Sequence, residues 1–162
     1  RKLSFKLNIY NMITIEEFKK KHSNKIRLIG LDLGSKRIGV SICDEKQTIA
    51  TPFKTLIKKN TSQLINEIKE IINENDVKGI IIGNPINMDG SQGKSSQSVK
   101  DMAKNISKSI NLPISFWDER LSTIGAFNIS SQLDINVSKR KRDIDKNAAA
   151  FILQGAIDYL NN

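Results

Sequence analysis

Hydrophobic residues along the chain form short continuous runs and runs with helical spacing, which together predict a mixed α/β domain. The short apolar runs predict five strands, at residues 27–33, 38–43, 53–57, 77–82 and 113–117. Apolar residues that recur every three or four positions predict helices at 64–72, 99–110 and 148–160, with another from about residue 122. The polar stretches 84–98 and 134–142 are interpreted as loops.

The order of these elements predicts how the strands pair. Short turns join the first three strands, which favours an antiparallel meander. The later strands are separated by helices, so they are expected to run parallel through right-handed crossovers. We therefore predict one mixed five-stranded sheet, with three antiparallel strands and then parallel strands, flanked by helices.

The first 25 residues are predicted to form a separate N-terminal extension, and residues 26–162 a single domain. Thr14 to Glu17 fits a capping box, which would start a short helix through Lys21. Residues 21–25 are then interpreted as a linker.

The charge of the chain favours one class of binding partner over others. Its 162 residues carry a formal net charge of +9, of which +5 lies in residues 1–26. A basic surplus favours nucleic acid as the partner, and no apolar run approaches the ~20 residues of a membrane span. Cys43 is the single cysteine, so no intrachain disulfide can form. We expect a cytoplasmic protein that does not contact a membrane.

Three acidic residues in separate segments are the candidates for a catalytic or metal-binding site. Asp32 ends the first strand, Glu119 follows the last strand, and Asp145 is expected in the first turn of the final helix. Side chains alternate along a strand, so only one of Asp118 and Glu119 can share a site with Asp32. Asp143 is an equally placed rival of Asp145. As alternatives, Asp32 would only form a turn, Glu119 an ion pair, and Asp145 an N-cap.

Converging carboxylates are typical ligands of Mg²⁺ or Mn²⁺, which prefer oxygen donors. Two such ions about 4 Å apart can activate a water and stabilise the leaving oxygen of a phosphodiester. The chain has no zinc-binding spacing or established nucleophile motif, since His22 lies in the linker and Cys43 in an apolar strand. A carboxylate–metal site is therefore the remaining route to hydrolysis.

Basic residues adjoin these carboxylates and are expected to contact phosphates without reading sequence. They are Lys36, Arg37, Arg120, Lys139, Arg140, Lys141, Arg142 and Lys146. The alternative for the run 139–142 is a solvated loop that keeps the protein in solution. Asn84 and Asn87 follow a strand and could shape a cleft, although a structural loop explains them equally well.

Four ordered segments resemble the YqgF (RuvX-like) family of RNase H-like proteins. They are GLDLGSKRIGV at 30–40, GNPINMDGS at 83–91, DERLST at 118–123 and DKNAAAFIL at 145–153. The resemblance extends from about residue 29 to 159 and leaves residues 1–25 outside. It implies the mixed sheet described above and an acidic triad of Asp32, Glu119 and Asp145. For this reason Glu119 is preferred to Asp118, and Asp145 to Asp143.

The resemblance also implies a function. Members of the family are described as pre-16S rRNA nucleases and as Holliday-junction-resolvase-like proteins. We therefore expect a metal-dependent hydrolase of phosphodiester bonds that processes the 5′ end of precursor 16S ribosomal RNA during ribosome biogenesis. Its partner would be structured RNA, its cofactor Mg²⁺ or Mn²⁺, and its state a monomer or weak dimer.

Three other functions fit part of the pattern. The same carboxylates would serve a Holliday-junction resolvase that cuts branched DNA as a dimer. A non-catalytic nucleic-acid-binding factor would show salt-sensitive binding without needing a divalent ion. An actin-like or sugar-kinase-like nucleotide-binding domain would use the DLGS segment at 32–35, but such proteins need a second related domain that this length does not provide.

Overall fold

The computed structural model describes residues 11–22, 24–85, 93–119 and 137–162, with backbone only at 94, 95 and 137–146. Its strands are β1 (Met12–Ile13), β2 (Leu28–Leu33), β3 (Arg37–Cys43), β4 (Ala50–Ile57), β5 (Gly79–Asn84) and β6 (Ile114–Asp118). Its helices are α2 (Ile15–Lys21), α3 (Thr61–Glu74), α4 (Lys94–Ser109) and α6 (Val137–Leu160). The helix expected from about residue 122 lies outside the described residues.

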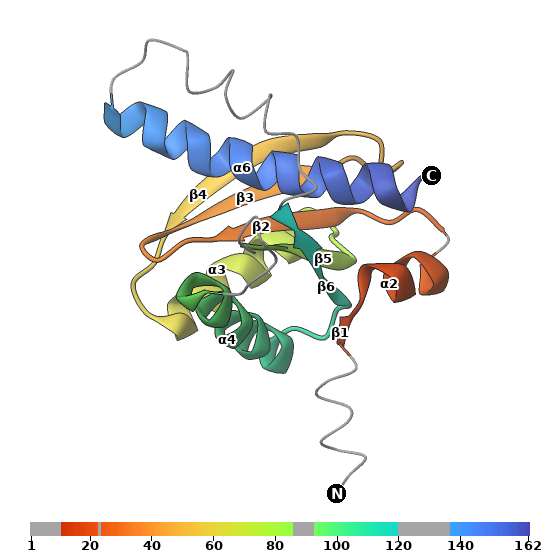
Figure 1. Cartoon of the computed structure of the whole chain (residues 1–162), viewed down its shortest axis with the longest axis horizontal. Coiled ribbons are helices and arrows are strands. Elements are labelled where there is room, and N and C mark those ends of the chain that lie inside the picture. The colour runs from red at the N-terminus through yellow and green to blue at the C-terminus, as the bar shows by residue number, and fades with distance from the viewer. Residues whose placement is uncertain (1–10, 23, 86–92, 120–136) are drawn as a thin grey trace, which may run out of the picture.

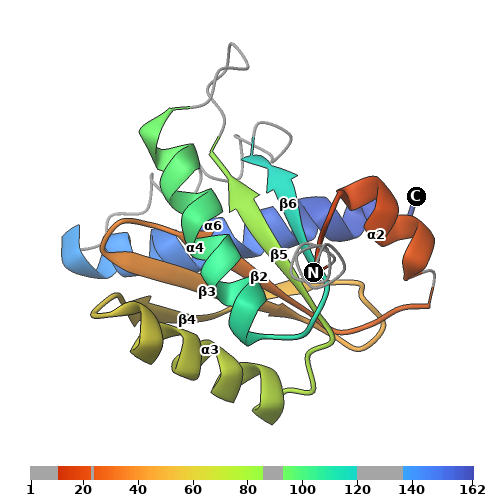
Figure 2. The same cartoon turned by 90° about the horizontal axis from the view of Figure 1, so that it is seen from below.

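The strands form one sheet in the order β1-β6-β5-β2-β3-β4. Strands β2, β3 and β4 pair antiparallel, whereas β2–β5, β5–β6 and β1–β6 pair parallel. Helix α6 crosses one face of the sheet, and α3 and α4 cover the other (Figures 1 and 2). The predicted class, a mixed sheet with an antiparallel meander and parallel later strands, is confirmed.

The sheet has six strands, so the predicted number of five was wrong. Met12 and Ile13 pair with Ile114 and Ser115 at the edge of the sheet. A two-residue strand is too short to show an alternating pattern, so only the backbone pairing reveals it. The short helix after it is confirmed as α2, where the Glu17 N–H donates to the Thr14 hydroxyl at 3.1 Å.

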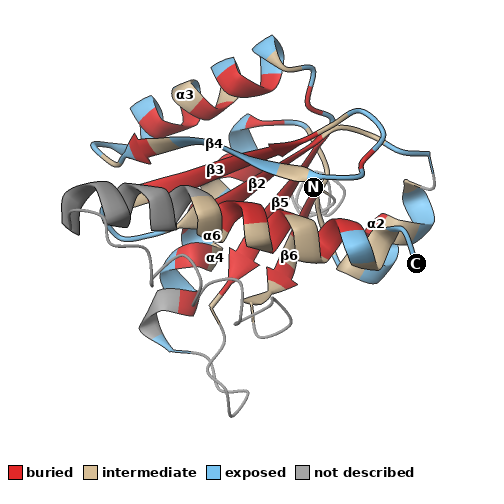
Figure 3. Ribbon diagram, turned by 90° about the horizontal axis from the view of Figure 1, so that it is seen from above, coloured by how far each residue is buried: buried red, intermediate tan, exposed pale blue. Residues whose placement is uncertain are grey.

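Buried residues run along the strands and along the helices on both sides of the sheet (Figure 3). One core lies between the sheet and helices α3 and α4, where the predicted apolar face of α3 (Leu64, Ile65, Ile68, Ile71 and Ile72) is buried. The other lies against α6 and includes Phe18 of α2, which is 1% exposed. The sheet is therefore a mainly apolar middle layer, in which Ser41 and Ser115 are buried polar exceptions.

Close approach fixes α6 on the sheet. A Cβ atom at Gly30 would lie 2.7 Å from Leu153 Cβ and 3.0 Å from the Ala149 carbonyl oxygen. The Ser41 hydroxyl donates to that same carbonyl at 2.7 Å. A larger residue than glycine at position 30 would push the helix away, so this position determines how near α6 lies to β2.

Helix α6 begins at Val137, well before the predicted start at 148. The expectation that Asp145 lies in the first turn was therefore wrong, and so was its alternative as an N-cap. Residues 137–147 lack apolar periodicity, so the hydrophobic pattern does not predict a helix there. Lysine and arginine have good helix propensity, so this charged stretch can extend the helix. Helix α4 likewise starts earlier than predicted, at Lys94 rather than 99.

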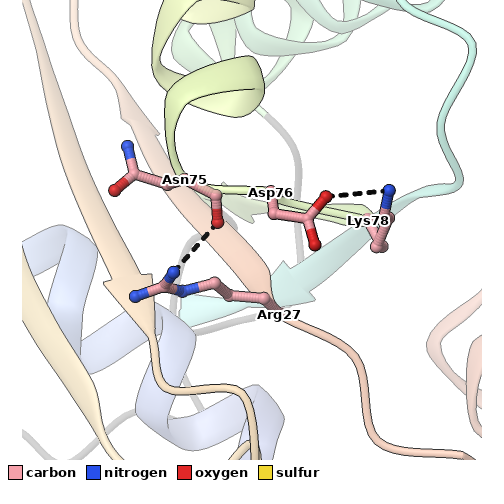
Figure 4. Close-up of polar contacts among 4 residues, drawn as sticks. All are labelled: Arg27, Asn75, Asp76 and Lys78. Carbon is pink, nitrogen blue, oxygen red and sulfur yellow. Dashed lines mark hydrogen bonds and ion pairs between the residues drawn. The ribbon is translucent and has the colours of Figure 1, made fainter.

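Hydrogen bonds and an ion pair lie at the amino end of β2 (Figure 4). Arg27 donates to the Asn75 carbonyl at 3.0 Å, at the end of α3, and to the Cys43 carbonyl at 2.9 Å. Beside it, Lys78 pairs with Asp76 at 3.0 Å. The amino end of β2 is thus tied to the end of α3 and to β3. No helix in the described part of the chain is long and apolar enough to cross a membrane.

Candidate active site

The carboxyl ends of β2, β5 and β6 meet at one edge of the sheet. Leu31 pairs with Ile82, and Gly83 pairs with Trp117, all in parallel register. Asp32, one residue beyond Leu31, therefore lies beside Gly83, and Glu119 follows directly after β6. In sheets of this kind, ligands bind beyond the carboxyl ends of the strands.

A cleft of about 450 Å³ opens at this edge and contains both carboxylates. Its described lining residues are Asp32, Leu33, Gly34, Ser35, Ile38, Lys58, Pro85, Ser98, Val99, Met102 and Glu119. Segments more than eighty residues apart in the sequence thus contribute two acidic groups to one concave surface.

The register also separates Glu119 from Asp118. Asp118 pairs with Asn84 and lines a neighbouring cavity with Met12 and Thr14, not the cleft that holds Asp32. A Cβ atom at Gly83 would lie 3.3 Å from the Glu119 carboxyl carbon and would collide with Ile152 of α6. Gly83 therefore leaves room for the Glu119 carboxyl group between β5 and α6.

The electrostatics of the cleft disfavour a second negative charge. Burial, together with the negative charges of Asp32 and Asp118, raises the pKa of Glu119 from 4.5 to about 7. Two carboxylates in a partly buried site repel each other unless a cation lies between them. The donor chemistry, hard carboxylate oxygens beside an open cleft, fits a divalent ion such as Mg²⁺ or Mn²⁺.

The third candidate, Asp145, lies in α6, four residues before Ala149. Its side chain is outside the described part of the structure. Among the side chains that are described, no group of three or more His, Cys, Asp or Glu residues could hold a metal ion. The described part of the site is therefore the Asp32–Glu119 pair.

The other candidate residues lie in several places. Lys36 is exposed in the turn between β2 and β3, and Arg37 begins β3. Asn84 is buried and accepts a hydrogen bond from the Ser96 hydroxyl at 2.9 Å, which ties β5 to α4. Asn87 and Arg120 lie outside the described residues. The side chains of Lys139, Arg140, Lys141, Arg142 and Lys146 also lie outside them.

Lys58 lines the cleft and was not predicted from the sequence. Its N–H donates to the Lys36 carbonyl at 2.9 Å, which fixes the end of β4 against the turn that follows Asp32. Nothing in the Lys58-Lys59 pair distinguishes one lysine from the other, so no local signal could have identified it. Ser98 and Met102 of α4 were likewise not recognised as cleft residues.

The chain is similar over most of its length to known proteins. It is 73% identical to the "Putative pre-16S rRNA nuclease" of Pelagibacter ubique (strain HTCC1062), over 93% of this chain and 100% of that protein. A relative of the same name from Chelativorans sp. (strain BNC1) is 41% identical, over 93% and 94% of the two chains.

The fold is also similar to a solved structure. Thermus thermophilus RuvC in complex with a Holliday junction substrate has a TM-score of 0.54 at 10% identity, over 78% of this chain and 91% of that one. Residues 26–159 match the model of the RuvX family, described as Holliday junction resolvase. The chain therefore belongs to the RuvX family.

Proposed function

We propose that this protein is a metal-dependent nuclease that hydrolyses phosphodiester bonds in precursor 16S ribosomal RNA and matures its 5′ end. The observation that carries the proposal is the pairing of Asp32 and Glu119 in one cleft at the carboxyl edge of the sheet. The names of the relatives, at 73% and 41% identity, support the RNA substrate. The cellular site we propose is the bacterial cytoplasm.

Asp32 and Glu119 would hold the divalent ions, with Asp145 as the third ligand. Bound Mg²⁺ or Mn²⁺ would activate a water and stabilise the leaving oxygen. The chain itself supplies the negative charge of the pair and the space over Gly83 in which the Glu119 carboxyl group fits. The cleft then orients a substrate phosphate against these ligands.

The backbone supports Asp145 as the third ligand. Asn161, at the end of α6, donates to the Gln47 carbonyl at 2.7 Å, and the Gln47 side chain accepts from the Ile26 N–H. Helix α6 therefore ends near the start of β2 and runs opposite to it. Ala149 of α6 lies against Gly30 of β2. From this point Asp145 lies four residues back along the helix, about 6 Å, and Asp32 lies two residues on along the strand, about 7 Å. Because the helix and the strand run in opposite directions, both displacements point the same way, which supports placing Asp145 beside Asp32.

Basic residues around the cleft would hold the phosphate backbone. Lys36 and Arg37 lie four and five residues after Asp32, and the remaining proposed contacts are Arg120, Lys139, Arg140, Lys141, Arg142 and Lys146. Such contacts neutralise phosphates and contribute affinity without sequence preference. Asn84 and Asn87 would shape the adjoining loop.

Branched DNA is the second candidate substrate. The description of the RuvX family and the similarity to a RuvC–Holliday junction complex favour it. The same carboxylates would serve both reactions. Cleavage of a precursor 16S fragment and of a four-way DNA junction, compared under the same conditions, separates the two.

Asp32→Asn tests the proposed site. Removing one ligand charge should lower cleavage of the precursor RNA with Mg²⁺ or Mn²⁺ by about 100-fold or more. Asp101→Asn, a change of the same kind on the exposed side of α4, is the control and should cut like the parent. If a folded Asp32→Asn protein cuts the RNA as fast as the parent, the assignment is wrong.

A further inference from the structure

We infer that the cleft binds one unpaired nucleotide next to the cleaved phosphate, so that the enzyme selects sites where the strand is not base-paired. This inference rests on the proposed nuclease function and adds the form of the substrate. It draws on the part of the cleft that metal binding does not use.

The cleft is larger and more apolar than a metal–phosphate site requires. Besides the two carboxylates, Leu33, Pro85, Val99 and Met102 line it. Apolar side chains offer no ligand to an ion or a phosphate oxygen, whereas the flat face of a nucleobase gains free energy when apolar side chains cover it. Its volume of about 450 Å³ falls in the range of pockets that hold small organic ligands.

Base pairing decides which nucleic acids can use this pocket. In a duplex the bases are stacked and paired inside the helix, and moving one of them out costs unstacking and unpairing free energy. A base in a bulge, loop or single strand is already free to enter. The cleft therefore favours strands with an unpaired nucleotide at the cleavage site.

Lys58 supplies the charge that the nucleotide needs. It is the one lysine or arginine among the described residues that line the cleft. Its backbone is held by the Lys36 carbonyl at 2.9 Å, and its side chain is only partly exposed. The neighbouring Lys59 is exposed and is not among the described lining residues. Lys58 would thus hold the phosphate of the nucleotide whose base lies against the apolar wall.

The test compares two RNA duplexes that differ by one bulged nucleotide. Binding of the full chain is measured by fluorescence anisotropy in calcium chloride, since Ca²⁺ takes the same oxygen ligands. We expect the bulged RNA to bind about tenfold more tightly than the paired one. Ser98→Phe fills the cleft from the exposed side of α4 and should abolish this preference.

Matched variants outside the cleft serve as controls for this test. Ser109→Phe places the same ring at the far, exposed end of α4 and should keep the preference. Lys58→Gln should reduce it, whereas Lys59→Gln should not. Equal binding of the two RNAs by the parent, or a preference that survives Ser98→Phe, would overturn the inference.

Cleavage with Mg²⁺ or Mn²⁺ separates this inference from the proposed function. A parent protein that prefers the bulged RNA but cuts neither RNA supports the nucleotide pocket and contradicts the nuclease. A parent that cuts both RNAs equally well, and binds them equally, supports the nuclease and contradicts the pocket.

Discussion

At the scale of single residues, the proposed chemistry depends on Glu119. It follows a strand that packs into the core, so its carboxyl group is partly buried beside Asp32 and held over Gly83. Its pKa is raised to about 7. A carboxyl group that is costly to ionise in the folded protein is a place where a bound cation is favoured.

The pKa of Glu119 predicts how stability changes with pH in protein free of divalent ions. Between pH 4.5 and 7 the folded protein keeps a proton that the unfolded chain releases. This contribution is complete below pH 4.5 and is lost as the pH rises through 7. We expect the free energy of unfolding to fall by about 1–2 kcal/mol, a value reduced because the carboxyl group is partly solvated.

Urea denaturation in EDTA between pH 4.5 and 8 measures this effect. Glu119→Gln should remove the loss, because its amide does not titrate. Glu70→Gln, on the exposed side of α3, should behave like the parent. Parallel pH profiles for the parent and Glu119→Gln would contradict the burial of this carboxyl group.

At the scale of elements, residues 11–22, which precede the matched residues 26–159, pack on the sheet. Strand β1 adds to the edge of the sheet beside β6, and α2 buries Phe18 against residues such as Leu28 and Ile81. The Asn11 side chain donates to the Ser107 carbonyl at 3.0 Å, which adds a link to α4. The division into an extension at 1–25 and a nuclease domain at 26–162 remains a prediction.

Phe18→Ala tests how far α2 contributes to the stability of the sheet. Removing a fully buried ring should lower the free energy of unfolding by about 3–5 kcal/mol. Lys20→Ala, in the same helix but exposed, should change it by less than about 0.5 kcal/mol. Thermal denaturation followed by circular dichroism measures both. A Phe18→Ala protein as stable as the parent would mean that α2 docks without supporting the core.

At the scale of the whole molecule, the site lies where three parallel strands end beside the turn from β2 to β3. Ligand binding to the folded state should therefore stabilise the entire domain. The net charge of +9 also favours a polyanionic partner.

Mn²⁺ at pH 8 should raise the melting temperature of the parent protein. At 100 times the dissociation constant, binding adds about 2.7 kcal/mol, which is roughly 5–10 °C for a chain of this size. Asp32→Asn and Glu119→Gln should each lose most of this rise, and Asp101→Asn should keep it. An unchanged melting temperature of the parent, or an equal rise in all four proteins, would place the metal elsewhere.

The sequence by itself determined the elements that have a repeating pattern. The strands that contain Leu31, Val40 and Ile81 and the helix that contains Ile68 could be predicted because each buries an apolar face. The acidic candidates Asp32 and Glu119 could be selected because they end strands and match family motifs.

Only the tertiary structure decided what depends on contacts between distant residues. Strand β1 exists because Met12 and Ile13 find β6, and no local pattern marks so short a strand. Lys58 lines the cleft, and its backbone N–H binds the Lys36 carbonyl, whereas Lys59 beside it is not among the described lining residues. Glu119 acquires a raised pKa because folding buries its carboxyl group away from water and brings Asp32 near it. Local sequence determines the secondary-structure propensity of a segment and which of its faces is hydrophobic. The pairing register of the strands and the burial of a side chain arise only when distant segments pack together in the folded chain.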